Sequence, residues 1–88
     1  MSVTIRKPTQ AEIDEASTWK TWTKGITIFD MDYTKSERCL ILEGDVKIIT
    51  PEKNYYFQGG DYVIFKKGLK CKWVINYPVK KKYLFEDK

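Results

Sequence analysis

The sequence contains no histidine among its 88 residues. This absence excludes most zinc enzymes, the serine and cysteine proteases that use a histidine base, and any pH switch built on imidazole. No apolar run approaches the roughly 18 residues of a transmembrane helix, and the first residues lack the apolar core of a signal peptide. Only two cysteines occur, which are too few for a disulfide framework. We therefore expect a cytoplasmic protein with reduced thiols that contacts no membrane.

A chain of this length can form only a thin core, so its large side chains must fill that core well. Aromatic residues make up 15% of the chain and suit this task. We expect a single domain across residues 1–88. The segment 66–88 contains eight lysines and only two acidic residues. We interpret the lysine run at 80–82 as charges on an edge strand that block edge-to-edge pairing.

The spacing of apolar residues predicts mostly β structure. Residues 3–5 read as a strand, and the capping box of Thr9 and Glu12 predicts a short helix at about residues 10–17. Trp19 and Trp22 follow, and we expect them to close one end of the domain. From residue 26 the apolar period is two, which predicts strands separated by turns. These strands lie at about residues 26–33, 39–42, 46–49, 55–57, 62–65, 71–75 and 79–85. The pattern indicates an all-β antiparallel sandwich or barrel, with its core at about residues 26–85.

Two segments resemble the conserved motifs of the cupin superfamily. They are residues 37–44 (ERCLILEG) and residues 60–73 (GDYVIFKKGLKCKW), with a hairpin between them. Cys71 and Trp73, together with Pro78 and Val79 further on, make the chain similar to small single-domain cupins of the (S)-ureidoglycine aminohydrolase type. The resemblance implies a cupin-like jelly-roll β-barrel with a pocket between its two sheets, and a homodimer.

The resemblance also implies a divalent metal held by three histidines and a glutamate. Glu37 matches the glutamate, seven residues before the motif glycine. Met31 and Tyr33 stand near the positions of the first-motif histidines, and Cys71 stands at that of the second-motif histidine. Three of the four usual ligands are therefore missing, so we expect no cofactor. A divalent metal on Glu37 and Cys71 is the weaker alternative, because zinc takes three or four protein ligands.

Strand alternation indicates which side chains share the pocket. If Glu37 points inward, so does Cys39, and if Cys71 points inward, so does Trp73. Desolvation makes a lone carboxylate harder to ionise unless Arg38, Lys70 or another donor reaches it, and such a group is a candidate acid or base. Both cysteines can equally be small core residues. We predict Glu37, Tyr33 and Cys71 as catalytic candidates and Met31, Cys39 and Trp73 as ligand-binding residues.

Three functions fit these patterns. The first is binding of a small polar metabolite in the barrel pocket, with or without proton transfer by Glu37 or Tyr33. The second is binding of single-stranded nucleic acid by lysines around Trp73, which the modest net charge of +4 makes less favourable. The third is a structural dimerisation module with a filled barrel. We favour the first and do not carry over the aminohydrolase reaction, because a fold does not determine a function.

Overall fold

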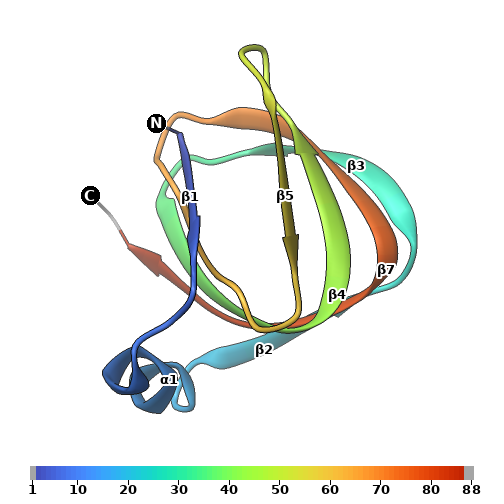
Figure 1. Ribbon diagram of the computed structural model, residues 1–88. Helices are drawn as coiled ribbons and strands as arrows, with labels where there is room; N and C mark the ends of the chain where they lie inside the picture. The colour runs from blue at the N-terminus through green and yellow to red at the C-terminus, as the bar shows by residue number, and fades with distance from the viewer. Residues whose placement is uncertain (1, 87–88) are drawn as a thin grey trace.

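The computed structural model describes residues 2–86 and consists of strands that curve around a central space, with one helix at the side (Figure 1). The elements are β1 (Val3–Arg6), α1 (Gln10–Ala16), β2 (Lys20–Lys24), β3 (Thr27–Asp32), β4 (Ser36–Ile49), β5 (Asn54–Gln58), β6 (Tyr62–Phe65) and β7 (Lys70–Glu86). Every strand pairing is antiparallel. The structure therefore confirms the all-β jelly-roll barrel with a short N-terminal helix.

The long strands β4 and β7 organise the barrel, because they pair with each other along most of their length. The first part of β4 also pairs with β6, and its last part pairs with β5. In β7, residues 70–75 pair with β3 and residues 79–83 pair with β2. One half of the barrel contains β6 and β2, and the other half contains β5 and β3. Each long strand thus belongs to both halves, and the core lies between them.

The bend between the two halves lies at Gly44. The register between β4 and β7 shifts three times between Ile41 and Val46. Gly44 has a φ of +136°, and a Cβ atom there would lie 2.9 Å from Cγ2 of Val79. The sequence predicted two separate strands on either side of this glycine, but the chain continues through it as one bent strand. The predicted strands at 71–75 and 79–85 are likewise one strand, β7. Ladder hydrogen bonds to β4 hold both segments together, which the local composition does not reveal.

The segment before β3 differs partly from expectation. The capping box is present: the backbone N–H of Glu12 donates to Thr9, and the N–H of Thr9 donates to the Glu12 carboxylate. The two tryptophans, however, do not close one end together. Trp19 packs on the outer face of the sheet beside Leu40 and Tyr62, whereas Trp22 lies on β2 and faces the interior. Within residues 2–86, no helix has the length and apolar character of a membrane-spanning segment.

The inward alternation predicted for both motif strands is confirmed. Glu37, Cys39 and Ile41 of β4 are buried, and so are Cys71, Trp73 and Ile75 of β7. Most other inward residues are aliphatic or aromatic, with rings packed edge-on and face-on at centroid separations of 4.7–6.3 Å. Glu37 is therefore a charged residue set into an apolar and aromatic core.

Candidate functional site

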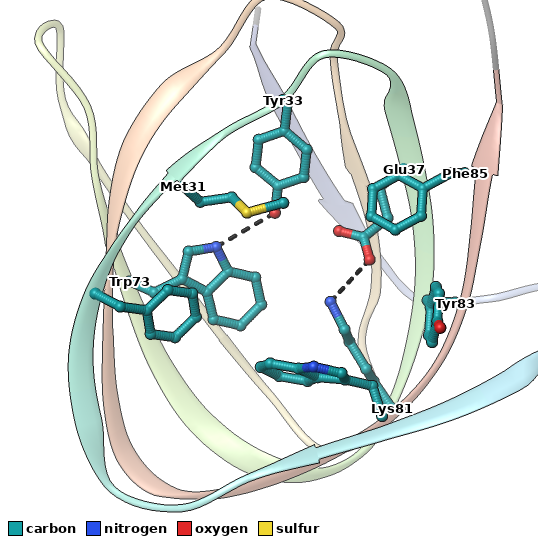
Figure 2. A pocket seen from close by; sticks show the side chains of 9 residues that line it. Met31, Tyr33, Glu37, Trp73, Lys81, Tyr83 and Phe85 are labelled. Atoms are coloured by element: carbon teal, nitrogen blue, oxygen red, sulfur yellow. Dashed lines mark hydrogen bonds and ion pairs between the residues drawn. The ribbon is translucent and has the colours of Figure 1, made fainter.

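The barrel interior contains a cavity of about 290 Å³ on the side of β2, β3 and the last part of β7 (Figure 2). Its polar lining residues are Tyr33, Glu37, Lys81 and Tyr83. Its apolar lining residues are Trp22, Phe29, Met31, Trp73 and Phe85. A mostly aromatic wall with a few convergent polar groups is typical of a small-molecule site.

A buried ion pair forms the polar centre of this cavity. The Lys81 ammonium donates a hydrogen bond to Oε2 of Glu37 at 2.8 Å, and the two side chains are 6% and 2% exposed. The prediction that the lysine run at 80–82 lies on an edge strand is wrong for Lys81. β7 is a central strand that pairs with both β4 and β2, so its alternate side chains point into the barrel.

The surroundings of Lys81 favour the ammonium form. Its Nζ atom lies 4.7 Å from the ring centre of Trp22 and 4.8 Å from that of Trp73, within range of cation–π attraction. Burial by itself lowers the pKa of Lys81, but the negative charges of Cys39 and Glu37 outweigh burial and leave the pKa raised. The carboxylate of Glu37, hydrogen-bonded to Nζ at 2.8 Å, is the nearest group of opposite charge.

The second oxygen of Glu37 has no such partner. Within residues 2–86, Oε1 is buried and accepts no hydrogen bond. A buried polar atom left unpaired costs about 1–3 kcal/mol, and more when it carries charge. In Figure 2 the carboxylate faces the space that Tyr33 and Lys81 also face. Oε1 is therefore an acceptor that a bound molecule could satisfy.

Tyr33 is held as a neutral hydroxyl group. The indole N–H of Trp73 donates to its oxygen at 3.2 Å, and its ring stacks on Phe65 with centroids 4.7 Å apart. Burial, and then the nearby charge of Glu37, raise the pKa of Tyr33 well above its ordinary value. In the described residues its hydroxyl hydrogen has no acceptor. Tyr33 can thus donate a hydrogen bond into the cavity.

The two cysteines lie outside the cavity lining. Cys39 is fully buried against the ion pair, and burial raises its pKa well above the ordinary value. Cys71 lines a separate hollow beside Thr50 and Lys70. Burial, followed by the charges of Glu37 and Asp30, raises the pKa of Cys71 to about 11. Both are thiols at neutral pH, which is the less nucleophilic form.

The structure therefore brings four of the six predicted site residues into one cavity: Tyr33, Glu37, Met31 and Trp73. Sequence reasoning missed Lys81, because alternation places it inside only once the structure shows that Val79 of the same strand faces inward. It also missed Trp22, which lies opposite Lys81 in the β2–β7 register. No local signal marked Trp22, because its neighbours on β2 are all threonine or lysine.

These residues do not fit the divalent metal that the cupin resemblance implies. Glu37 is the one carboxylate among the residues lining the cavity. The Lys81 ammonium, 2.8 Å from it, places a positive charge where a cation would have to bind. In the part of the chain that is described, no three His, Cys, Asp or Glu side chains come close enough to hold a metal ion. The Lys81 ammonium, and not a metal ion, is thus the cation that pairs with the Glu37 carboxylate.

Comparison with known proteins agrees with this architecture. Residues 11–83 match the EutQ-like cupin domain family. No curated protein matches the chain. The crystal structure of a DUF861-family protein from Thermotoga maritima is similar, with a TM-score of 0.90 and 39% identity over 96% of this chain and 99% of that one.

Two EutQ structures share the fold at lower identity. The Clostridium difficile EutQ protein has a TM-score of 0.70 and 18% identity, covering 76% of this chain and 53% of its own. A putative ethanolamine utilization protein EutQ from Salmonella typhimurium has a TM-score of 0.67 and 15% identity, covering 94% and 68%. The family match, which spans most of the chain, settles the relationship: this chain belongs to the EutQ-like cupin domain family.

Proposed function

We propose that this chain binds a small metabolite in the cavity around Glu37, Tyr33 and Lys81. The observation that carries the proposal is the unpaired Oε1 atom of Glu37, buried in an aromatic cavity. A ligand that donates a hydrogen bond to this atom would remove a cost that the unliganded barrel bears.

The dimensions of the cavity favour a small ligand. Its volume of about 290 Å³ lies near the lower end of the roughly 300–1,000 Å³ typical of ligand pockets. The aromatic walls can contact the body of such a molecule, while the three polar groups orient its polar end. Lys81 replaces a metal ion as the positive charge of the site.

Proton transfer by Glu37 is the reaction that this site supports best. An ionised carboxylate can accept a proton from a bound ligand. The raised pKa of Cys71 keeps it protonated, so a nucleophilic role for that thiol is weaker than the sequence indicated. The likeness to ureidoglycine aminohydrolase-type cupins stays a prediction. Its reaction is no part of this proposal, because the donor set does not fit the metal.

The other functions gain no support from particular residues. A base-stacking surface around Trp73 would need an exposed ring, and Trp73 is 1% exposed. A barrel filled by its own side chains would have no cavity beside Glu37. Dimerisation and a cytoplasmic location stay predictions, and light scattering of the purified protein would measure the first.

Filling the cavity tests the proposal. Met31 and Ile28 both lie on β3, but Met31 faces the cavity and Ile28 faces outward. We expect Met31→Trp to abolish ligand-induced shifts of the Trp22 and Trp73 indole signals in NMR spectra, measured with a panel of metabolites of different charge. Ile28→Trp, the matched control, should leave these shifts intact. If no compound in the panel shifts these signals in the unmodified protein, the proposal is wrong.

A further inference from the structure

We infer that the cavity selects ligands of zero net charge that carry an N–H donor and a C=O acceptor side by side, as on the edge of an amide. This inference rests on the proposed function and specifies its ligand class. It follows from the unsatisfied hydrogen-bonding groups, the charge balance and the shape of the same cavity.

The hydrogen-bonding groups call for both a donor and an acceptor on the ligand. Oε1 of Glu37 accepts and has no donor within residues 2–86. The Lys81 ammonium has three N–H groups, of which one is bound to Glu37. Tyr33 offers a hydroxyl hydrogen without an acceptor. One N–H on the ligand can bind Glu37 while one carbonyl oxygen accepts from Lys81 or Tyr33.

These groups converge although they come from distant parts of the chain. Tyr33 lies in the turn after β3, Glu37 near the start of β4, and Lys81 in the last part of β7. Figure 2 shows the hydroxyl, the carboxylate and the ammonium pointing toward one another across the cavity. A small ligand can therefore contact all three at once with a single edge.

Charge balance excludes a singly charged ligand as the preferred one. Glu37 and Lys81 already neutralise each other. A ligand carboxylate near Lys81 would also face the charge on Glu37, and a ligand ammonium near Glu37 would face Lys81. In a buried site either charge would lack compensation, which opposes binding strongly. A neutral amide edge satisfies the hydrogen-bonding groups and adds no charge.

The walls favour a flat molecule. The rings of Phe29 and Trp73 stack with centroids 5.6 Å apart, and Trp22 meets Trp73 edge-on at 5.9 Å. Broad aromatic surfaces bind planar groups by stacking and edge contacts. Together with the small volume, this favours a planar ring that includes the amide edge.

Four small probes of similar size test the inference with the intact chain. They are 2-pyridone, which has a planar amide edge, N-methyl-2-pyridone, which lacks the donor, and the ions benzoate and benzylammonium. We expect 2-pyridone to bind at least about tenfold more tightly than each of the others, measured by calorimetry and by NMR shifts of Trp22 and Trp73. Loss of affinity on N-methylation reports directly on the acceptor atom of Glu37.

Substitutions give a second readout that does not depend on the affinity of one probe. Glu37→Gln removes the negative charge and should shift the preference toward benzoate, whereas Glu43→Gln, exposed on the same strand, should not. Tyr33→Phe keeps the stacked ring and should weaken 2-pyridone binding several-fold, because it removes one donor to the carbonyl oxygen. Tyr56→Phe, at an exposed tyrosine, is its control. Circular dichroism confirms that each variant is folded.

The outcomes separate this inference from the proposed function. If an ion or N-methyl-2-pyridone binds as tightly as 2-pyridone, the amide-edge class is wrong and cavity binding stands. The same holds if 2-pyridone fails to bind while another metabolite shifts the Trp22 and Trp73 signals. If no small molecule of any charge shifts them, the proposed function is wrong, and the inference falls with it.

Discussion

Lys81 and Glu37 form a buried ion pair, 2.8 Å between Nζ and Oε2, although they lie 44 residues apart in the chain. The pair sits in an aromatic cavity, and Trp22 and Trp73 cover the ammonium. The lysine side chain thus supplies the positive charge for which the cupin resemblance implied a metal ion. We expect both the stability of the barrel and the proposed ligand selection to depend on this arrangement.

We expect Lys81→Met to destabilise the fold by about 3–5 kcal/mol, because it leaves the Glu37 carboxylate buried without its counter-ion. Urea denaturation at neutral pH measures the change in the free energy of unfolding. Lys80→Met, at an exposed position of the same strand, should change it by no more than about 0.5 kcal/mol. The double variant Glu37→Gln/Lys81→Met should recover much of the loss. Equal effects of the two single lysine substitutions would show that the buried pair contributes nothing.

Both thiols should resist alkylation in the folded protein at neutral pH. Burial raises the pKa of Cys71 to about 11, against 9.0 for the ordinary thiol, and raises that of Cys39 as well. Iodoacetamide labelling mapped by mass spectrometry should therefore show slow modification of Cys71 at pH 8 that accelerates toward pH 11. Cys39 should be labelled only when urea is added. Rapid labelling of folded Cys71 at pH 7 would contradict the raised pKa.

The same shift has a consequence for stability. The unfolded state releases the Cys71 proton near pH 9, and the folded state near pH 11. The contribution of this thiol to stability is thus complete below pH 9 and declines as the pH rises toward 11. Urea denaturation of the wild type and of Cys71→Ala across this range should show the difference between them shrinking.

Glu12 should stabilise the start of the helix in a pH-dependent way. The hydrogen bonds from Arg6 and then from the Thr9 backbone lower the pKa of Glu12 from 4.5 to about 2. Its contribution is therefore present above pH 4.5 and is lost as the pH falls toward 2. Glu12→Gln should melt a few degrees below the wild type at pH 7, and the difference should become small at pH 2. Glu15→Gln, an exposed carboxylate on the same helix, should change melting less at either pH.

Gly44→Ala should destabilise the barrel at its bend. The φ of +136° disfavours any side chain, and a Cβ atom would lie 2.9 Å from Cγ2 and 3.2 Å from Cα of Val79. We expect a loss of about 1–3 kcal/mol in the free energy of unfolding, measured by urea denaturation. Gly25→Ala, where no atom lies within 4 Å of the new Cβ and φ is ordinary, should be close to neutral. Equal effects of the two substitutions would rule out strain at the bend.

Local patterns predicted the elements that depend on neighbours in sequence. The Thr9–Glu12 capping box located the helix start, because both of its hydrogen bonds span three residues. The alternation of Glu37, Cys39 and Ile41 predicted their common inward direction, because the side-chain period of a strand is two. Gly44 led to the wrong prediction of two separate strands, because a glycine that ends a strand and a glycine that lets a strand bend look the same in a sequence.

Lys81 shows why the centre of the site could not be predicted in the same way. A run of three lysines is typical of an exposed edge, and nothing within the run distinguishes its middle member. Its burial depends on β7 having partners on both sides, and those partners lie at residues 20–24 and 36–49. The same pairings place Cys71 in a different hollow from Glu37, although the motif pattern associates them.

The all-β character, the helix start and the inward faces of the strands follow from the sequence alone, because each depends on the chemistry of residues a few positions apart. Which strand is central, where the long strands bend, and which cation meets Glu37 follow only from the folded barrel. These depend on pairings between segments tens of residues apart, whose free energy belongs to the whole barrel and to no single segment.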